Sequence, residues 1–181
     1  MSIPTSSDQV DSLSFYTPVQ DGLRQVEESL RQVCREGFPY LAHLLEQTLL
    51  GHGKRVRPAL TLLAAQFHEC APRPPVLMAT AVELLHIASL IHDDTVDNAP
   101  IRRGRPTLSS LFGKQVAVLV GDYVFARSAT FVCDTSNIRA VRRFAETIMA
   151  LSRGELREIV AAYDWRQGRE SYWQRITDKT A

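Results

Sequence analysis

The sequence predicts an all-α protein, and three observations carry this prediction. Apolar residues from 19 to 33 recur at spacings of three and four, which is typical of an amphipathic helix. The stretch 115–133 is apolar on nearly all sides, as in a buried helix. Alternation of polar and apolar residues never lasts for more than a few positions, which argues against a sheet.

Residues that interrupt helices set the boundaries of the elements. The first four helices are separated by Gly37 and Pro39, by the glycines around His52, by the prolines of 72–75 and by Pro100. Residues 135–137 offer an N-cap to a later helix that runs to about 165. About seven helices are expected, with a loop over 100–106 and a short helical turn over 107–112; the other expected ranges are 19–33, 40–50, 57–70, 76–98, 115–133 and 171 onward.

Composition and charge exclude several classes of protein. Among 181 residues, 45% are hydrophobic and 23% charged, which excludes collagen-like and disordered chains. With 21 Lys and Arg against 20 Asp and Glu, the net charge of +1 argues against a general nucleic-acid binder. The three cysteines are odd in number and far apart, so we expect buried, reduced thiols rather than a disulfide framework.

No targeting segment or membrane span is expected. The first fourteen residues contain five Ser, two Asp and no Lys or Arg, unlike a secretory signal or a transit peptide. The most apolar stretch, 77–91, is interrupted by Glu83 and His86. We therefore expect a cytoplasmic protein with a flexible tail over residues 1–16 and a single domain over 17–181.

Three carboxylates lie at the end of the expected helix 76–98. Asp93 and Asp97 are one turn apart on one face, with Asp94 beside them and His86 on the same face. The C-terminal end of a helix is already negative, so a bound cation would relieve the repulsion. Paired carboxylates suit Mg²⁺, which takes its other ligands from water and phosphate. A solvated, polar helix end is the alternative.

Two basic segments flank this acidic helix end. Gly53, Lys54 and Arg57 lie where a helix begins, and free N–H groups there favour an anion. Arg102 and Arg103 diverge in the expected loop, and their planar forks suit phosphate oxygens. The alternatives are a surface patch for the first segment and ion pairing of Arg102 with the aspartates for the second. Together, the acidic and basic segments predict a reaction between small diphosphates.

The same segments resemble the trans-type polyprenyl diphosphate synthases, also called polyprenyl synthetases. The similar pieces occur in the order of that family and cover residues 53–58, 83–97, 102–107, 121–122 and 179–181. The resemblance implies an isoprenoid-synthase helical bundle, usually a homodimer. It also implies that isopentenyl diphosphate is added to an allylic diphosphate after Mg²⁺-assisted ionisation, and that a proton is then eliminated.

The resemblance also implies roles for individual residues. Isopentenyl diphosphate would be bound by Lys54, Arg57, His86 and Arg103. The allylic diphosphate would be bound by Arg102, Lys179 and Thr180. Mg²⁺ would be bound by Asp93 and Asp97, with Asp94 in support. Small residues at Ala88 and Ser89 would leave the product channel open, which predicts geranylgeranyl diphosphate or a longer product.

The sequence departs from the family at one point. A second aspartate-rich motif is expected further along, but the later acids Asp134, Asp164 and Asp178 stand singly. We therefore interpret the chain as the N-terminal part of a synthase, without the C-terminal helices of the bundle.

Two other functions compete with this interpretation. One is a metal-dependent phosphohydrolase built on His86, His92, Asp93 and Asp97. The other is a non-catalytic subunit that binds diphosphate.

The sequence also predicts structural roles for three further side chains. His92 is expected to pack or to support the site. Glu155 is expected to line a cavity, or else to pair with a buried arginine. Asp122 is expected to pair with a core donor such as Arg127.

Overall fold

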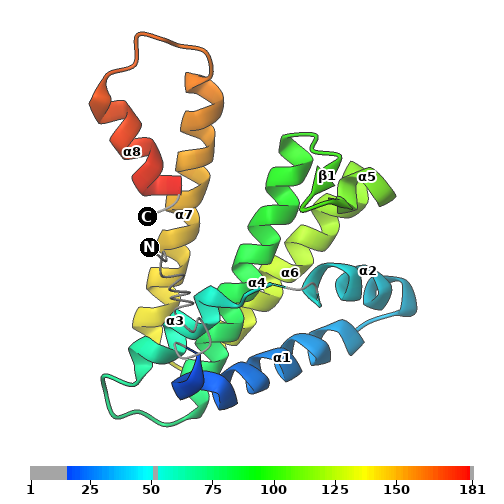
Figure 1. The fold of residues 1–181 in the computed structure, drawn as a ribbon, viewed down its shortest axis with the longest axis vertical. Helices are drawn as coiled ribbons and strands as arrows, with labels where there is room; N and C mark the ends of the chain where they lie inside the picture. The colour runs from blue at the N-terminus through cyan, green and yellow to red at the C-terminus, as the bar shows by residue number, and fades with distance from the viewer. Residues whose placement is uncertain (1–15, 51–52, 180–181) are drawn as a thin grey trace, which may run out of the picture. The chain divides into compact units, whose positions relative to one another are not determined.

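Within the part of the chain that the structure describes, the regular elements are helices and one short hairpin (Figure 1). A computed structural model describes residues 16–50 and 53–179. Within those residues the elements are η1 (Thr17–Val19), α1 (Gln20–Arg35), α2 (Pro39–Leu49), α3 (Val56–Ala65), α4 (Arg73–Val96), β1 (Ile101–Arg102), β2 (Arg105–Pro106), α5 (Leu108–Phe112), α6 (Lys114–Asp134), α7 (Ile138–Ala161) and α8 (Arg169–Lys179). The predicted all-α class is confirmed.

The elements form two compact units, one up to Thr135 and one from Ser136 onward. In the first unit, α4 and α6 run side by side and supply much of the core (Figure 1). Leu84 of α4, Val124 of α6 and Leu30 of α1 are completely buried. Burial of such side chains stabilises the fold by about 1.5–3 kcal/mol each. The site described below is therefore built on the most firmly packed helix of this unit.

Three expectations about the elements were wrong. The segment 100–106 is a hairpin rather than an open loop. Helix α3 ends at Ala65 instead of residue 70, because the next three N–H groups bond to carbonyls three residues back and tighten the turn. Helix α7 ends at Ala161 instead of residue 165, and Tyr163 just beyond it takes a left-handed conformation with φ 65°.

The cysteines match the sequence prediction only in part. All three are free thiols, as expected. Cys34 is buried, and burial raises the pKa of its thiol to about 11. Cys70 and Cys133 are exposed, because they lie just beyond α3 and at the end of α6, outside the packed faces of these helices.

Most of the expected N-terminal tail, residues 1–15, lies outside the described residues. Tyr16 packs against the core of the first unit, and its hydroxyl donates a hydrogen bond of 2.8 Å to the Lys54 carbonyl.

By length and composition alone, α4 and α6 could each cross a membrane. Core helices of other proteins meet the same criteria, so this is weak evidence.

Candidate active site

The acidic end of α4 has the predicted geometry. The N–H of Asp97 donates to the carbonyl of Asp93 at 2.8 Å, so these two residues are one helical turn apart. Asp97 is exposed and caps the helix, Asp93 is half-buried and Asp94 is buried. The helix ends there because Asn98 takes a left-handed conformation with φ 54°, which asparagine tolerates better than most residues.

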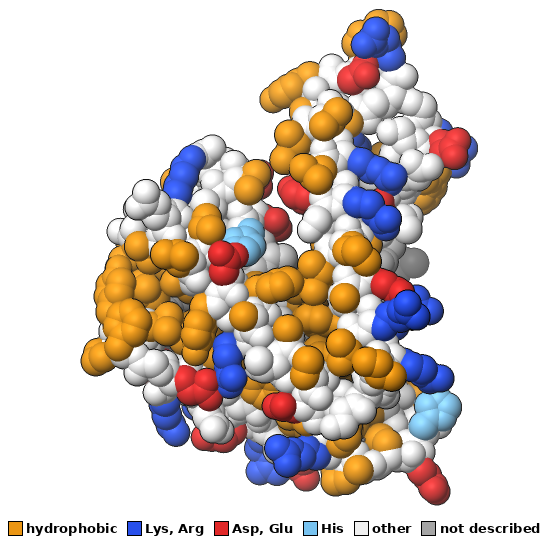
Figure 2. Space-filling view, turned by 180° about the vertical axis from the view of Figure 1, so that it is seen from behind, with side chains coloured by type: hydrophobic (Ala, Val, Ile, Leu, Met, Phe, Trp, Pro, Cys, Tyr) orange, Lys and Arg blue, Asp and Glu red, His pale blue; other side chains and the backbone are white. Residues whose placement is uncertain are grey.

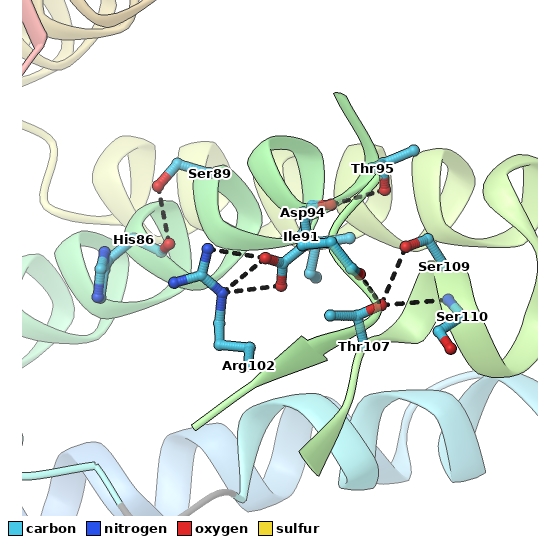
Figure 3. Close-up of polar contacts among 10 residues, drawn as sticks. His86, Ser89, Ile91, Asp94, Thr95, Arg102, Thr107, Ser109 and Ser110 are labelled. Atoms are coloured by element: carbon cyan, nitrogen blue, oxygen red, sulfur yellow. Dashed lines mark hydrogen bonds and ion pairs between the residues drawn. The ribbon is translucent and has the colours of Figure 1, made fainter. Parts of the chain in front are cut away.

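Asp94 is paired with Arg102 (Figure 3). The Nε of Arg102 lies 2.7 and 2.8 Å from the two carboxylate oxygens, and a terminal nitrogen lies 2.7 Å from one of them. This ion pair was one of the two alternatives left open for Arg102. The carboxylate of Asp94 is thus already paired with a cation. This pairing is compatible with the supporting role predicted for Asp94.

The two adjacent arginines occupy different positions of a tight hairpin. Ile101 pairs with Pro106 and Arg102 with Arg105, so Arg103 and Gly104 form the two-residue turn. Both have positive φ, 51° and 76°, as in turns that match the twist of the strands. Arg102 therefore lies in a strand and Arg103 in the turn, and the expected extended loop is absent here.

Thr107 anchors this hairpin to the helices on either side (Figure 3). Its hydroxyl donates to the carbonyl of Ala99 at 2.7 Å and accepts a bond from the N–H of Ser110, which caps α5. Its own N–H donates to the carbonyl of Pro100 at 3.1 Å. One buried residue thus fixes both ends of the segment that carries the arginines.

His86 lies in a cationic environment. Burial lowers its pKa below the usual 6.5, and the charge of Arg57 lowers it further. Arg103 and Arg102 act in the same direction, while Glu83 opposes them. Three other predicted site residues, Arg57, Arg102 and Arg103, therefore lie within electrostatic reach of His86.

Three of these four side chains line a cavity of about 390 Å³ in the first unit, and Arg57 is not part of the lining. His86, Arg102 and Arg103 line it together with Asp94 and Gly53. Apolar residues of α4 and α5 form another part of the wall; these are Ile87, Leu90, Ile91, Leu108 and Leu111. A volume of this size with a few convergent polar groups is typical of a small-molecule site.

The basic segment before α3 includes a residue that the sequence reasoning missed. Lys54 and Arg57 are exposed, as expected of groups that meet a ligand. Arg55 between them is turned inward, is the N-cap residue of α3, and pairs with Glu27 and Glu83. Buried Glu83 was the available signal, because a buried carboxylate needs a cationic partner.

The acidic helix end fits a magnesium ion in part. Among the described residues no group of three or more His, Cys, Asp or Glu side chains converges as a metal cage. Mg²⁺ does not require one, because it is often held by one or two carboxylates together with water and phosphate oxygens. Asp93 and Asp97, one turn apart at the end of α4, match that arrangement.

The second unit contains Lys179, which was predicted to bind the allylic diphosphate. Its ammonium lies 2.9 Å from Glu155 and 2.6 Å from Glu158, both on α7. Burial alone would lower the pKa of Lys179, but these carboxylates raise it to about 12. Glu155 therefore pairs with a lysine, which was not one of the two roles weighed for it. Thr180 lies outside the described residues.

Helices α7 and α8 approach each other closely at Gly154. A Cβ atom at this position would lie 2.6 Å from the backbone nitrogen of Lys179. Only glycine leaves room for that contact. The small residue thus holds the end of α8 against α7 and keeps Lys179 beside its two carboxylates.

His92 packs between α4 and α6, as expected. Its Nε2 lies 3.3 Å from Asp122 and 3.4 Å from the carbonyl of Val118. The predicted pairing of Asp122 with Arg127 was wrong: Asp122 lies on the exposed side of α6 and faces His92. Arg127 instead pairs with Glu36 at 2.9 Å, because its side chain faces the end of α1.

Ala88 and Ser89 remain a prediction about product length. Ala88 is 1% exposed and belongs to the core of the first unit, so close helix packing also accounts for its small size. The hydroxyl of Ser89 donates to the carbonyl of His86 at 2.9 Å (Figure 3). Neither residue lines the 390 Å³ cavity.

Solved structures share this all-helical fold. A polyprenyl synthase from Caulobacter crescentus, complexed with calcium and isoprenyl diphosphate, matches with a TM-score of 0.87 and 27% identity over 97% of this chain and 53% of its own. A decaprenyl diphosphate synthase from Rhodobacter capsulatus matches with a TM-score of 0.86 and 33% identity over 92% of this chain and 51% of its own.

The chain belongs to the polyprenyl synthetase family, whose model matches residues 38–181. Among curated relatives, a heptaprenyl diphosphate synthase component 2 from Geobacillus stearothermophilus is 38% identical over 93% of this chain and 52% of its own length. A prenyl transferase from Synechocystis is 35% identical over 95% of this chain and 54% of its own. The chain thus spans about half the length of these relatives.

Proposed function

We propose that the chain carries part of the active site of a prenyltransferase that condenses isopentenyl diphosphate with an allylic diphosphate. The observation that carries the proposal is the cavity lined by His86, Arg102, Arg103 and Asp94, at the end of α4 that also carries Asp93 and Asp97. The product would be a longer trans-polyprenyl diphosphate. Relatives named heptaprenyl diphosphate synthase component 2 and octaprenyl diphosphate synthase support this class of reaction.

Each group would have a distinct task. Mg²⁺ held by Asp93 and Asp97 would draw negative charge onto the leaving diphosphate. Arg103, His86, Lys54 and Arg57 would bind the diphosphate of isopentenyl diphosphate. Arg102 would bind the allylic diphosphate, while Asp94 holds Arg102 in place. Apolar side chains such as Leu90 and Leu108 would keep water from the allylic cation.

The two competing functions are less well supported. A phosphohydrolase would need His86, His92, Asp93 and Asp97 to converge on one metal, but the described residues contain no such group. A non-catalytic subunit would have little use for an aspartate pair at the end of α4.

We propose a homodimer for the whole protein, although the name component 2 of one relative also suggests a second type of subunit. Free, exposed cysteines favour the reducing cytoplasm as the location.

The first test is binding of inorganic pyrophosphate with and without Mg²⁺, followed by calorimetry. Pyrophosphate should bind much more tightly with Mg²⁺, and Asp93→Asn should remove that gain while leaving the helical signal intact. Asp134→Asn is a matched control, because Asp134 is an exposed acid at the end of α6. Equal Mg²⁺ dependence in the unmodified chain and in Asp93→Asn would contradict the metal assignment.

A further inference from the structure

Arg55 makes three separate contacts with three different elements. Its Nε lies 2.5 Å from Glu27 of α1, one terminal nitrogen lies 2.7 Å from Glu83 of α4, and the other donates to the carbonyl of Leu49 at 3.0 Å. The side chain is 12% exposed and that of Glu83 is 8% exposed. The planar guanidinium therefore ties α1, the end of α2 and α4 to the start of α3.

The positive charge of Arg55 is neutralised within the protein by two carboxylates. Burial alone would lower its pKa, but the hydrogen bonds and charges of Glu27 and Glu83 raise it. Two carboxylates share this one cation, so Arg55 has no charge to offer a diphosphate. The side chains of Lys54 and Arg57, in contrast, are exposed to solvent.

The backbone of Arg55 is held in a costly conformation. Its φ of 49° is left-handed, which few residues other than glycine, asparagine and aspartate adopt readily. Such strain persists only where the surroundings enforce it. The three side-chain contacts supply that enforcement, and the turn they impose determines the direction in which the chain enters α3.

The contact with Glu83 connects this turn to the cavity. Glu83 lies three residues before His86 on α4, so both are on neighbouring positions of one helix face. Arg55, Glu83 and His86 all line the 390 Å³ cavity. Arg57, two residues after Arg55, is close enough to lower the pKa of His86. The ion pair thus joins two parts of the site that are distant in sequence.

We propose that Arg55 is a positioning residue for the diphosphate site. It holds residues 53–57 against α4, so that Arg57 stays beside His86 without a ligand. This inference rests on the proposed function, and it adds a residue that does not itself touch the substrate. Lysine cannot replace it, because a single ammonium cannot reach three partners in one plane.

The test uses Arg55→Lys in the full chain, with Arg31→Lys as the matched control on the surface of α1. Hydrogen exchange of amides 53–57 should become faster in Arg55→Lys and stay unchanged in the control. The KM for isopentenyl diphosphate should rise about tenfold or more, since small displacements of binding groups weaken a site strongly. The allylic KM and kcat should change by less than about twofold.

If Arg55→Lys folds poorly, the milder variant Glu83→Gln provides a second test. Glu83→Gln retains an oxygen that accepts the hydrogen bond from Arg55 but loses the charge. It should shift exchange and KM in the same direction by a smaller amount. Unchanged exchange at 53–57, or an equal change in both KM values, overturns the positioning role. Failure of the unmodified chain to bind pyrophosphate instead overturns the proposed function.

Discussion

His86 is the titratable residue whose surroundings have the clearest consequence for ligand binding. Burial and the charge of Arg57 lower its pKa below 6.5, so the ring is neutral at pH 7. Because the unfolded chain binds the proton more tightly, the neutral ring favours the folded state above pH 6.5. That contribution is lost as the pH falls from 6.5 toward the lower pKa of the folded state.

We expect pyrophosphate binding to be coupled to proton uptake by His86. An anion among these arginines offsets their charge and raises the pKa of the ring, so binding below pH 6.5 should be accompanied by proton uptake. Calorimetry in two buffers of different ionisation enthalpy measures this uptake. His86→Gln should abolish it, whereas His43→Gln, on α2, should not. Equal uptake in the two variants would contradict the prediction.

Gly121 provides the space that His92 occupies. A Cβ atom at this position would lie 2.3 Å from the Nε2 of His92, so alanine must displace the ring from its place beside Asp122. Gly121→Ala should therefore destabilise the protein by about 1–3 kcal/mol. In a His92→Ala background the same substitution should be nearly neutral. Urea denaturation of the four chains measures the coupling, and additive effects would refute the contact.

At the scale of elements, the hairpin separates the tasks of two adjacent arginines. Arg102 lies in a strand and faces Asp94, whereas Arg103 lies in the turn. Lysine keeps the charge but loses the planar fork. Arg103→Lys should raise the KM for isopentenyl diphosphate more than that for the allylic substrate, and Arg102→Lys should do the opposite. Initial rates with each substrate varied in turn provide the measurement. The same pattern in both variants would show that the tasks are not divided.

The sequence alone predicts those features that depend on residues close together in the chain. The apolar surface of α4 and α6, the prolines between helices and the spacing of Asp93 and Asp97 all depend on near neighbours in the chain. The contacts of Arg55 and Arg127 could not be predicted in this way. Their partners Glu27, Glu83 and Glu36 lie 28 to 91 residues away, and which carboxylate faces which arginine depends on how helices pack.

The hairpin was missed for a different reason. Its strands have two residues each, so no alternation of polar and apolar residues can develop. Its turn uses Arg103 rather than asparagine or glycine at the first central position, which weakens the usual turn signal. Fixation by Thr107, through bonds to Ala99 and Ser110, becomes visible only in the folded structure.

At the scale of the molecule, exposed apolar side chains indicate association. Figure 2 shows apolar side chains gathered on one face of the molecule. In the first unit, Leu119 of α6 is 68% exposed and Phe38, before α2, is 61% exposed. Extended apolar surface of this kind is typical of sites of contact with another protein.

We expect the chain to form dimers that Leu119→Glu weakens, because the new charge would have to be buried at the contact. Gln32→Glu is the matched control, since it adds the same charge at an exposed position on another helix, α1. Sedimentation velocity over a range of concentrations measures the dimer. An equal shift in both variants would indicate a general effect of charge, and no shift in either would place the contact elsewhere.

The short sequence distance between Asp94 and Arg102 has a consequence for the order of folding. Only eight residues separate the two partners, and Thr107 closes the hairpin onto Ala99 over the same distance. Closing so short a loop costs little entropy and takes well under a microsecond. This corner of the cavity can therefore assemble as soon as α4 is in place, while the Arg55 contacts must wait for three helices to meet. A nascent chain would form this hairpin before the second unit had left the ribosome.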